Sequence, residues 1–291
     1  MLSMIELREV SYSWPDEPVV LEKLSLHIRP GEKVVLLGAN GCGKSTLLKL
    51  MNGLLDPEQG ALFWKGEQIT RQSLRQPGQA AAFRRACVLL FQHPEAMLFN
   101  PTVRDELAYG PRQLGLSDVE ARIARWADEL ALTALLDKPP FLLSGGQKQK
   151  LALGCLLALD PEMLLLDEPS TSLDPATVGW LVDTLIHSDK TLVIATHNLS
   201  LAAELGERCI VLGLKGQILF DGPIRMALSG VSLLESAGLT HRHKHRHGKV
   251  AHAHVHAHDW EGVGHSLAMR YVKGDCTFQR SSRASNHDVS D

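Results

Sequence analysis

The stretch Val34-Val35-Leu36-Leu37-Gly38-Ala39-Asn40-Gly41-Cys42-Gly43-Lys44-Ser45 decides the fold of this chain. Its four apolar residues are typical of a buried parallel strand. The next eight match the pattern G-x-x-x-x-G-K-[ST], and the spacing of Leu47, Leu48 and Met51 predicts a helix directly after them. Strand, glycine-rich loop and helix together predict a P-loop, in which backbone N–H groups surround phosphate oxygens.

The P-loop predicts a nucleoside triphosphate and Mg²⁺ as ligands. Lys44 is expected to reach the β- and γ-phosphates, and the Ser45 hydroxyl to ligate Mg²⁺. Cys42 is a small residue at a tolerant position, although it predicts some sensitivity to thiol modification. The nucleotide-binding residues expected from this loop are Gly38, Ala39, Asn40, Gly41, Cys42, Gly43, Lys44, Ser45 and Thr46.

Two further apolar runs, at 163–166 and 192–195, also read as buried parallel strands. The first ends at Asp167-Glu168 and the second at Thr196-His197. Because ligands bind at the carboxyl ends of strands in open α/β sheets, these groups should meet the P-loop at one edge. Asp167 is expected to hold Mg²⁺, and Glu168 to orient or deprotonate the attacking water.

The rest of the pattern places this core inside a larger α/β fold. Alternating segments at 5–12 and 24–28, with a hairpin at 61–69, predict an antiparallel β layer beside the parallel sheet. Residues 102–136 are rich in Ala, Leu, Arg and Glu and predict an inserted helical subdomain. A late hairpin is expected at 210–220.

Composition excludes several classes of protein. The 291 residues have a formal net charge of -3, with 44% hydrophobic and 22% charged residues, so nucleic acid is not an expected partner. Five scattered cysteines without C-x-x-C spacing argue against disulfides or a zinc site and fit the cytosol. The N-terminus lacks a signal-peptide pattern. The apolar runs are far shorter than the roughly 20 residues of a membrane span, so work at a membrane would require docking to another subunit.

The sequence Leu143-Ser144-Gly145-Gly146-Gln147 identifies the class of P-loop protein. With the P-loop and the acidic strand end, it resembles the signature of ATP-binding cassette (ABC) ATPases, over about residues 1–235. The resemblance implies an ABC ATPase domain at 1–240, with its helical subdomain at about 95–150. It also implies that Ser144, Gly145, Gly146 and Gln147 bind the γ-phosphate held by a second subunit's P-loop.

The same resemblance implies roles for other residues. Tyr12 would stack on adenine, with Trp14 as a nearby competitor, and the loop at 172–174 would act across the dimer. The implied catalytic residues are Glu168, His197, Gln92 and Lys44, and the implied Mg²⁺ ligands are Ser45, Gln92 and Asp167. ATP and Mg²⁺ are therefore the expected ligands. Lys150 departs from the family, since many relatives have an arginine there.

The segments 91–95, 98–99, 101–103 and 106–111 are similar to ATPases of energy-coupling-factor importers, especially those for cobalt and nickel. This implies a homodimer at the cytoplasmic face of the membrane that docks to transmembrane coupling and substrate-binding subunits. Glu95 is hypothesised to pair with an arginine of the membrane partner, and the alternative is a solvated carboxylate.

Residues 241–291 form a histidine-rich tail that composition predicts to be disordered. Its histidines alternate with other residues, which places each run on one face of an extended chain. Imidazole suits nickel, cobalt, copper and zinc, and the second run, without interleaved cations, should bind more tightly. The alternative is a solvated tail with incidental affinity. The candidate metal ligands are His241, His243, His245, His247, His252, His254, His256 and His258.

The function expected from these features is ATP hydrolysis coupled to import of a transition metal, nickel or cobalt. The first alternative is an energy-coupling-factor ATPase for a vitamin or another solute. A second is a soluble, non-transport ABC ATPase, which the single cassette and the lack of heptad repeats disfavour. A metal-storage protein is a third, disfavoured because each expected hydrolytic residue is present.

Overall fold

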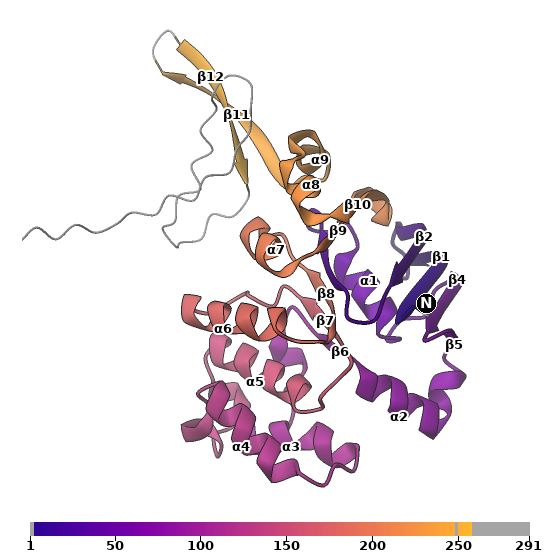
Figure 1. Ribbon diagram of the computed structural model, residues 1–291, viewed down its shortest axis with the longest axis vertical. Helices are drawn as coiled ribbons and strands as arrows, with labels where there is room; N and C mark the ends of the chain where they lie inside the picture. Colours follow the sequence, from indigo (N-terminus) through magenta and orange to yellow (C-terminus); the bar gives the residue numbers. More distant parts are fainter. Residues whose placement is uncertain (1–2, 248–249, 258–291) are drawn as a thin grey trace, which may run out of the picture. The chain divides into compact units, whose positions relative to one another are not determined.

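The computed structural model describes residues 3–247 and 250–257, and from residue 241 onward it describes the backbone alone. A six-stranded sheet and a four-stranded sheet form the framework that the helices cover (Figure 1). The strands of these two sheets are β1 (Ile5–Ser13), β2 (Val19–Ile28), β3 (Lys33–Leu37), β4 (Gln59–Trp64), β5 (Glu67–Ile69), β6 (Cys87–Leu90), β7 (Met163–Asp167), β8 (Thr191–Ala195), β9 (Arg208–Leu212) and β10 (Ile218–Pro223). The helices are α1 (Lys44–Met51), α2 (Pro77–Ala86), α3 (Val103–Gln113), α4 (Val119–Glu129), α5 (Gly145–Leu157), α6 (Pro175–Ile186), α7 (Leu199–Leu205), α8 (Ile224–Ser229) and α9 (Val231–Ser236).

The six-stranded sheet has the order β10-β9-β3-β8-β7-β6. Strands β9, β3, β8, β7 and β6 are parallel, and β10 joins the edge antiparallel to β9. The three strands predicted from apolar runs and the late hairpin are confirmed. Sequence analysis predicted neither β6 nor the preceding α2.

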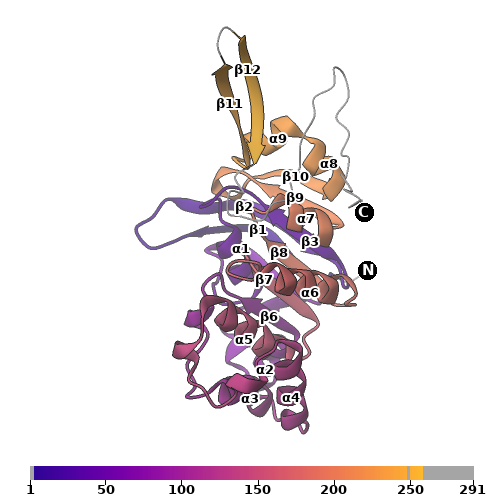
Figure 2. The same ribbon diagram turned by 90° about the vertical axis from the view of Figure 1, so that its left-hand side faces the viewer.

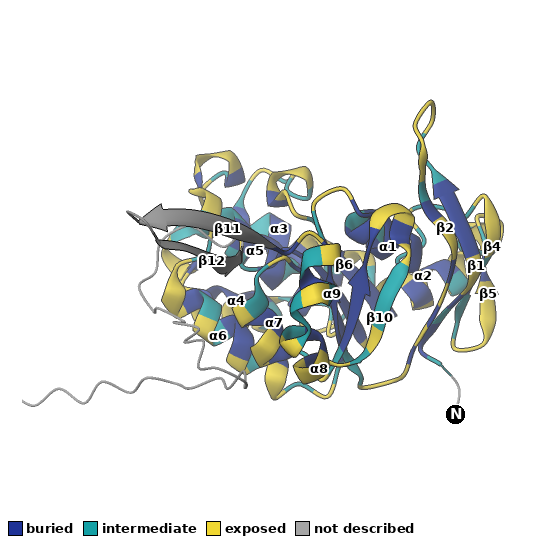
Figure 3. Ribbon diagram, turned by 90° about the horizontal axis from the view of Figure 1, so that it is seen from above, coloured by how far each residue is buried: buried dark blue, intermediate teal, exposed yellow. Residues whose placement is uncertain are grey.

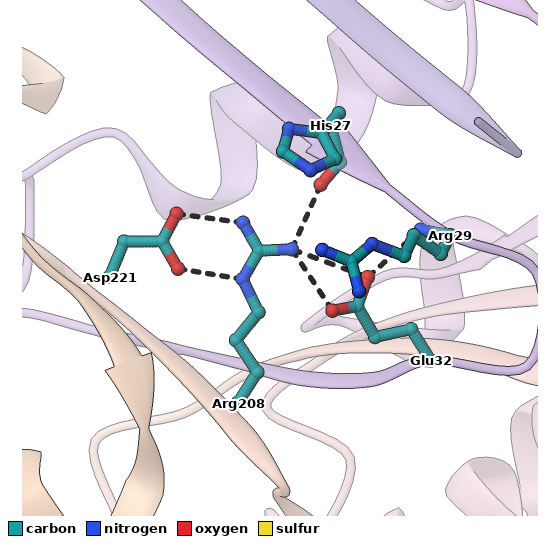
Figure 4. A network of polar contacts seen from close by, with 5 residues as sticks. All are labelled: His27, Arg29, Glu32, Arg208 and Asp221. Carbon is teal, nitrogen blue, oxygen red and sulfur yellow. Dashed lines mark hydrogen bonds and ion pairs between the residues drawn. The ribbon is translucent and has the colours of Figure 1, made fainter. Parts of the chain in front are cut away.

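The four-stranded sheet, of order β2-β1-β4-β5, is the predicted antiparallel layer. It packs with α1 on one face of the six-stranded sheet, around buried side chains that include Ile5, Leu47 and Leu165. Arg208, at the start of β9, links the six-stranded sheet to the four-stranded sheet through its side chain (Figure 4). Its guanidinium bonds both Asp221 carboxylate oxygens, at 2.6 and 2.7 Å, and the backbone oxygen of His27 in β2 at 2.9 Å.

The opposite face of the six-stranded sheet is covered by helices. Alternate residues of β7 and β8, such as Leu164 and Ile194, pack with α5, α6 and α7. Figures 1 and 2 show α3, α4 and α5 gathered at one end, where they form the predicted helical subdomain between β6 and β7. Helices α8 and α9 pack on the same face further along, against β3 and β9. Figure 3 shows how completely these layers bury the central strands.

The histidine-rich segment differs from its prediction. Two antiparallel strands, β11 (Thr240–His247) and β12 (Val250–Ala257), lie within the region that composition predicts to be disordered. The physical reason is the period-two alternation of this segment, which is a strand pattern even though its residues are polar. Residues 248–249 and 258–291, including His258, lie outside the described residues.

Within 3–247 and 250–257, no helix combines the length and apolar character that crossing a membrane requires.

Candidate nucleotide-binding and hydrolysis site

The loop from Gly38 to Ser45 joins the end of β3 to the start of α1. Gly41 and Gly43 have φ values of 80° and 102°, which side chains with a Cβ rarely adopt. A Cβ on Gly43 would also lie 2.8 Å from Cδ2 of Leu21. Glycine is therefore required at position 43 by both the backbone conformation and the packing of β2.

Lys44 is the first residue of α1, and its side chain contacts the backbone of the preceding loop. Its Nζ donates to the carbonyl oxygens of Gly38, at 2.7 Å, and Ala39, at 3.1 Å, and the residue is only 7% exposed. The backbone N–H of Ala39 donates to the carbonyl of Ala237, at 3.1 Å, so the C-terminal end of α9 supports the same loop. The ammonium group is thus held at the centre of the predicted phosphate cradle.

Cys42 is almost completely buried in this loop. Burial raises the pKa of its thiol, and Lys44 opposes this only in part. The thiol is therefore protonated at neutral pH, which lowers the reactivity that its position in the P-loop suggested.

The predicted Mg²⁺ ligands Ser45 and Asp167 lie in contact. Asp167 ends β7, is 5% exposed, and is hydrogen-bonded to the Ser45 side chain. Burial raises the pKa of this carboxyl, with Glu168 adding to the rise and Ser45 opposing it. A hydroxyl and a carboxylate are hard oxygen ligands of the kind that Mg²⁺ prefers, so the donor set fits this ion. Gln92 follows β6, which pairs with β7, and is exposed at the same sheet edge.

Glu168 and His197 are brought together by the adjacent strands β7 and β8. The Glu168 Oε1 atom lies 2.7 Å from Nδ1 of His197, and its Oε2 accepts a 3.0 Å hydrogen bond from the hydroxyl of Thr196. Glu168 is 5% exposed, and these two contacts orient its carboxylate. Sequence analysis placed Thr196 beside His197 at the end of this strand but predicted no role for it.

The LSGGQ segment forms the N-terminus of α5. Ser144 and Gln147 form a capping box, since the Ser144 hydroxyl accepts from the Gln147 N–H at 3.3 Å and the Gln147 side chain accepts from the Ser144 N–H at 3.0 Å. Ser144 and Gly145 are exposed. A Cβ on Gly146 would lie 2.8 Å from the carbonyl oxygen of Ser172, which itself has a φ of 64°. The signature is therefore packed against the loop at 172–174.

The P-loop and the signature cover opposite faces of the six-stranded sheet. Helix α1 belongs to the core shared with the antiparallel sheet, whereas α5 belongs to the core shared with α6 and α7. The six-stranded sheet therefore lies between α1 and α5. This arrangement is the one expected if the signature serves the P-loop of another subunit, as the sequence resemblance implies.

Gln149 and Lys150, which follow the signature in α5, contact the segment that follows β7. The buried Gln149 side chain donates to the carbonyl of Pro169 at 3.2 Å, and Lys150 lies 3.4 Å from Asp174. Hydrogen bonds from the Thr177 side chain and backbone lower the pKa of Asp174 to about 2. Lysine at position 150 therefore still has a carboxylate partner at the start of α6.

Tyr12 and Trp14, the two aromatic residues considered for stacking on adenine, differ in how far they are buried. Tyr12 is 9% exposed and belongs to the hydrophobic core, with its ring edge-to-face on Trp14 at a centroid distance of 5.3 Å. Trp14 is half-buried, and the Nζ atom of Lys49 in α1 lies 5.4 Å from its ring centroid. Trp14 is thus less buried than Tyr12 and lies beside the P-loop helix.

Comparisons with known proteins identify the family of this chain. Residues 21–171 match the family model described as "ABC transporter". The chain is 39% identical to the nickel import ATP-binding protein NikO of Rhodobacter capsulatus, covering 82% of this chain and 96% of the relative. It is 34% identical to the energy-coupling factor transporter ATP-binding protein EcfA of Methanothermobacter thermautotrophicus, covering 81% and 76%.

Among solved structures, cbiO1 of Clostridium perfringens, part of the ABC transporter complex cbiONQ, matches with a TM-score of 0.66 and 26% identity. The match covers 82% of this chain and 96% of cbiO1. The P-loop, the acidic strand end, the signature and these matches lead to one conclusion. This chain belongs to the ABC transporter family and is an ATPase subunit of the energy-coupling-factor type.

Proposed function

We propose that two copies of this chain hydrolyse ATP to drive import of a transition-metal ion, nickel or cobalt, through membrane subunits at the cytoplasmic face. The observation that supports a metal most directly is the pair of histidine runs in a chain that is 39% identical to NikO. The EcfA relative, whose name states no solute, keeps a vitamin or another solute as the alternative.

The residues at the sheet edge have separate tasks in hydrolysis. Lys44 and the P-loop N–H groups bind and orient the β- and γ-phosphates, in place of the carbonyl contacts that Lys44 now makes. Ser45, Asp167 and Gln92 would hold Mg²⁺, which would supply positive charge that offsets the charge of the phosphates.

Glu168 accepts the proton of the attacking water. The Thr196 hydroxyl donates to one oxygen of the Glu168 carboxylate, and His197 contacts the other. Upon closure, the Ser144 hydroxyl and the N–H groups at the start of α5 reach the γ-phosphate bound by the partner. Hydrolysis therefore requires the dimer, because α5 and the P-loop helix of one chain lie on opposite faces of the sheet.

The surface proposed to receive the membrane subunit follows β6. Phe99 is 66% exposed and packs edge-to-face on exposed Tyr109, with ring centroids 4.9 Å apart. The buried Glu106 carboxylate holds this segment by accepting from the backbone N–H groups of Phe99 and Asn100. Glu95 is exposed nearby, as pairing with an arginine of the membrane subunit requires.

The test is uptake of nickel and of cobalt by cells that express the intact transporter. Wild-type chain is compared with Glu168→Gln, and with Glu162→Gln as the matched control, since Glu162 is an exposed carboxylate that pairs with Lys65 at 2.6 Å. Collapse of one metal's uptake in the Glu168 variant alone supports the proposal and identifies the metal. Unchanged uptake of both metals, with ATP hydrolysis lost, refutes metal import and favours another solute.

A further inference from the structure

Thr196 is the first residue after β8, and its side chain is completely buried. Its hydroxyl donates to Oε2 of Glu168 at 3.0 Å and accepts from the backbone N–H of Asn198, the N-cap of α7, at 3.1 Å. The Asn198 N–H can only donate, and an ionised carboxylate can only accept. The direction of both hydrogen bonds is therefore determined, and the single hydroxyl proton belongs to the Glu168 side.

The backbone on either side of this contact is also held by hydrogen bonds. The Thr196 N–H donates to the carbonyl of Leu36 in β3 at 3.1 Å, and the Glu168 N–H donates to the carbonyl of Ala195 in β8 at 2.9 Å. Strand β8 lies between β3 and β7 in the sheet, and β3 ends at Leu37, directly before the P-loop. Thr196 thus connects the strand that leads to the P-loop with the residue that follows β7.

The two oxygens of the Glu168 carboxylate have different surroundings. Oε2 accepts from the completely buried Thr196, whereas Oε1 lies 2.7 Å from Nδ1 of His197, whose side chain is 45% exposed. A neutral imidazole carries its proton on one of two nitrogens, so the character of the His197 contact depends on the tautomer. The Thr196 hydroxyl carries its proton in every form of the site. Oε2 is therefore the oxygen held from the protein interior, and Oε1 is the oxygen on the exposed side.

We propose that Thr196 is a positioning residue for ATP hydrolysis, which holds Oε2 of Glu168 so that Oε1 faces the attacking water. This role rests on the proposed function, in which Glu168 accepts the proton of that water. In this scheme Thr196 acts through Glu168 alone. Misplacement of a catalytic group by about 1 Å can cost about 10²-fold in rate, so loss of the hydroxyl should lower kcat while ATP binding persists.

The test removes the hydroxyl and keeps the shape of the side chain. Thr196→Val does this, and Thr196→Ser restores the hydroxyl without the methyl group. The matched control is Thr191→Val, at the start of the same strand. Thr191 is 1% exposed and its hydroxyl accepts from the Gly31 N–H at 2.9 Å, so the control also loses a buried hydrogen bond, but away from Glu168. Phosphate release by the assembled transporter gives kcat and KM, and nucleotide binding is measured in parallel.

The proposal predicts a fall in kcat of about 10–10²-fold for Thr196→Val, with KM and the Kd for ATP within about twofold of wild type. Thr196→Ser should recover kcat to within about threefold of wild type, and Thr191→Val should keep the wild-type kcat even if its melting temperature falls. Thr196→Ala removes the same hydroxyl with a smaller side chain and is expected to show the same fall in kcat. It keeps the test open if the valine variant does not fold.

Three results would overturn the positioning role. They are an unchanged kcat in Thr196→Val, an equal loss in Thr196→Ser, which would assign the effect to packing of the methyl group, and an equal loss in Thr191→Val, which would assign it to general destabilisation. Glu168→Gln, measured alongside, separates this proposal from the one on which it rests. If Glu168→Gln turns over normally, the assignment of the base fails and the positioning role fails with it. If it collapses while Thr196→Val keeps its kcat, the positioning role fails alone.

Discussion

Replacing Glu168 with glutamine is the sharpest test of the hydrolytic site. The side chain is 5% exposed and accepts hydrogen bonds at both oxygens, so an isosteric amide fills the same space. The amide oxygen still accepts from Thr196, which keeps the disturbance of packing small. What is lost is the negative charge and the capacity to take a proton from water.

Loss of a positioned general base typically costs about 10²–10⁴ in rate, or about 3–5 kcal/mol of activation free energy. We therefore expect kcat for ATP hydrolysis to fall by about 10²–10⁴. ATP affinity should stay within about twofold, because Lys44 and the P-loop hold the phosphates.

The assay is phosphate release by the assembled transporter, with nucleotide binding measured in parallel. Glu162→Gln, at the other end of β7, controls for loss of a carboxylate as such and should retain wild-type turnover. Turnover of Glu168→Gln within tenfold of wild type, at equal ATP binding, would refute the assignment of Glu168 as the base. A loss of ATP binding would show instead that the carboxylate organises the phosphate site.

Three other predictions concern separate parts of the site. Trp14→Ala should weaken ATP binding by about tenfold, the loss of one stacked base at about 1–3 kcal/mol, whereas Tyr12→Phe should change it by less than twofold; a fluorescent ATP analogue measures both. Gly146→Ala forces a Cβ to within 2.8 Å of Ser172, and should lower ATPase activity more than tenfold while ATP binding to the P-loop persists. Because burial raises the pKa of Cys42, its alkylation by iodoacetamide should be slow at pH 7 and faster toward pH 9, monitored by peptide mass spectrometry; fast labelling at pH 7 would contradict its burial.

The strands and loops expected to bind the phosphates could be predicted because their residue patterns are compatible with few other structures. Four apolar residues followed by Gly38 or Asp167 leave little alternative to a buried strand that ends at a site. Strand β6 does not fit this rule, because Cys87–Leu90 continues into the apolar Phe91 and does not end at a glycine or a carboxylate. The preceding α2 has three buried residues in ten, too weak a stripe for its periodicity to be evident.

The supporting residues could not be predicted because their partners are distant in sequence. Thr196 acts through Glu168, 28 positions away, and Gln149 through Pro169, 20 positions away. Which aromatic is less buried depends on how β1 packs, and no motif distinguishes Tyr12 from Trp14. In the histidine segment, composition suggested disorder while alternation indicated strands, and only the register shows which histidines are partners.

The hydrogen bond from the Ala39 N–H to Ala237 has a consequence for where this ATPase can be cut. The resemblance to the family covers about residues 1–235, but the acceptor of this P-loop hydrogen bond, the Ala237 carbonyl, follows that range. Leu239 is 4% exposed and its N–H bonds Leu234, so the chain is still seated in the core two residues later. Truncation after residue 235 would leave a P-loop amide without its acceptor, whereas truncation after Leu239 would spare it. A chain that ends at Leu239 therefore retains this acceptor and stops where the histidine hairpin begins.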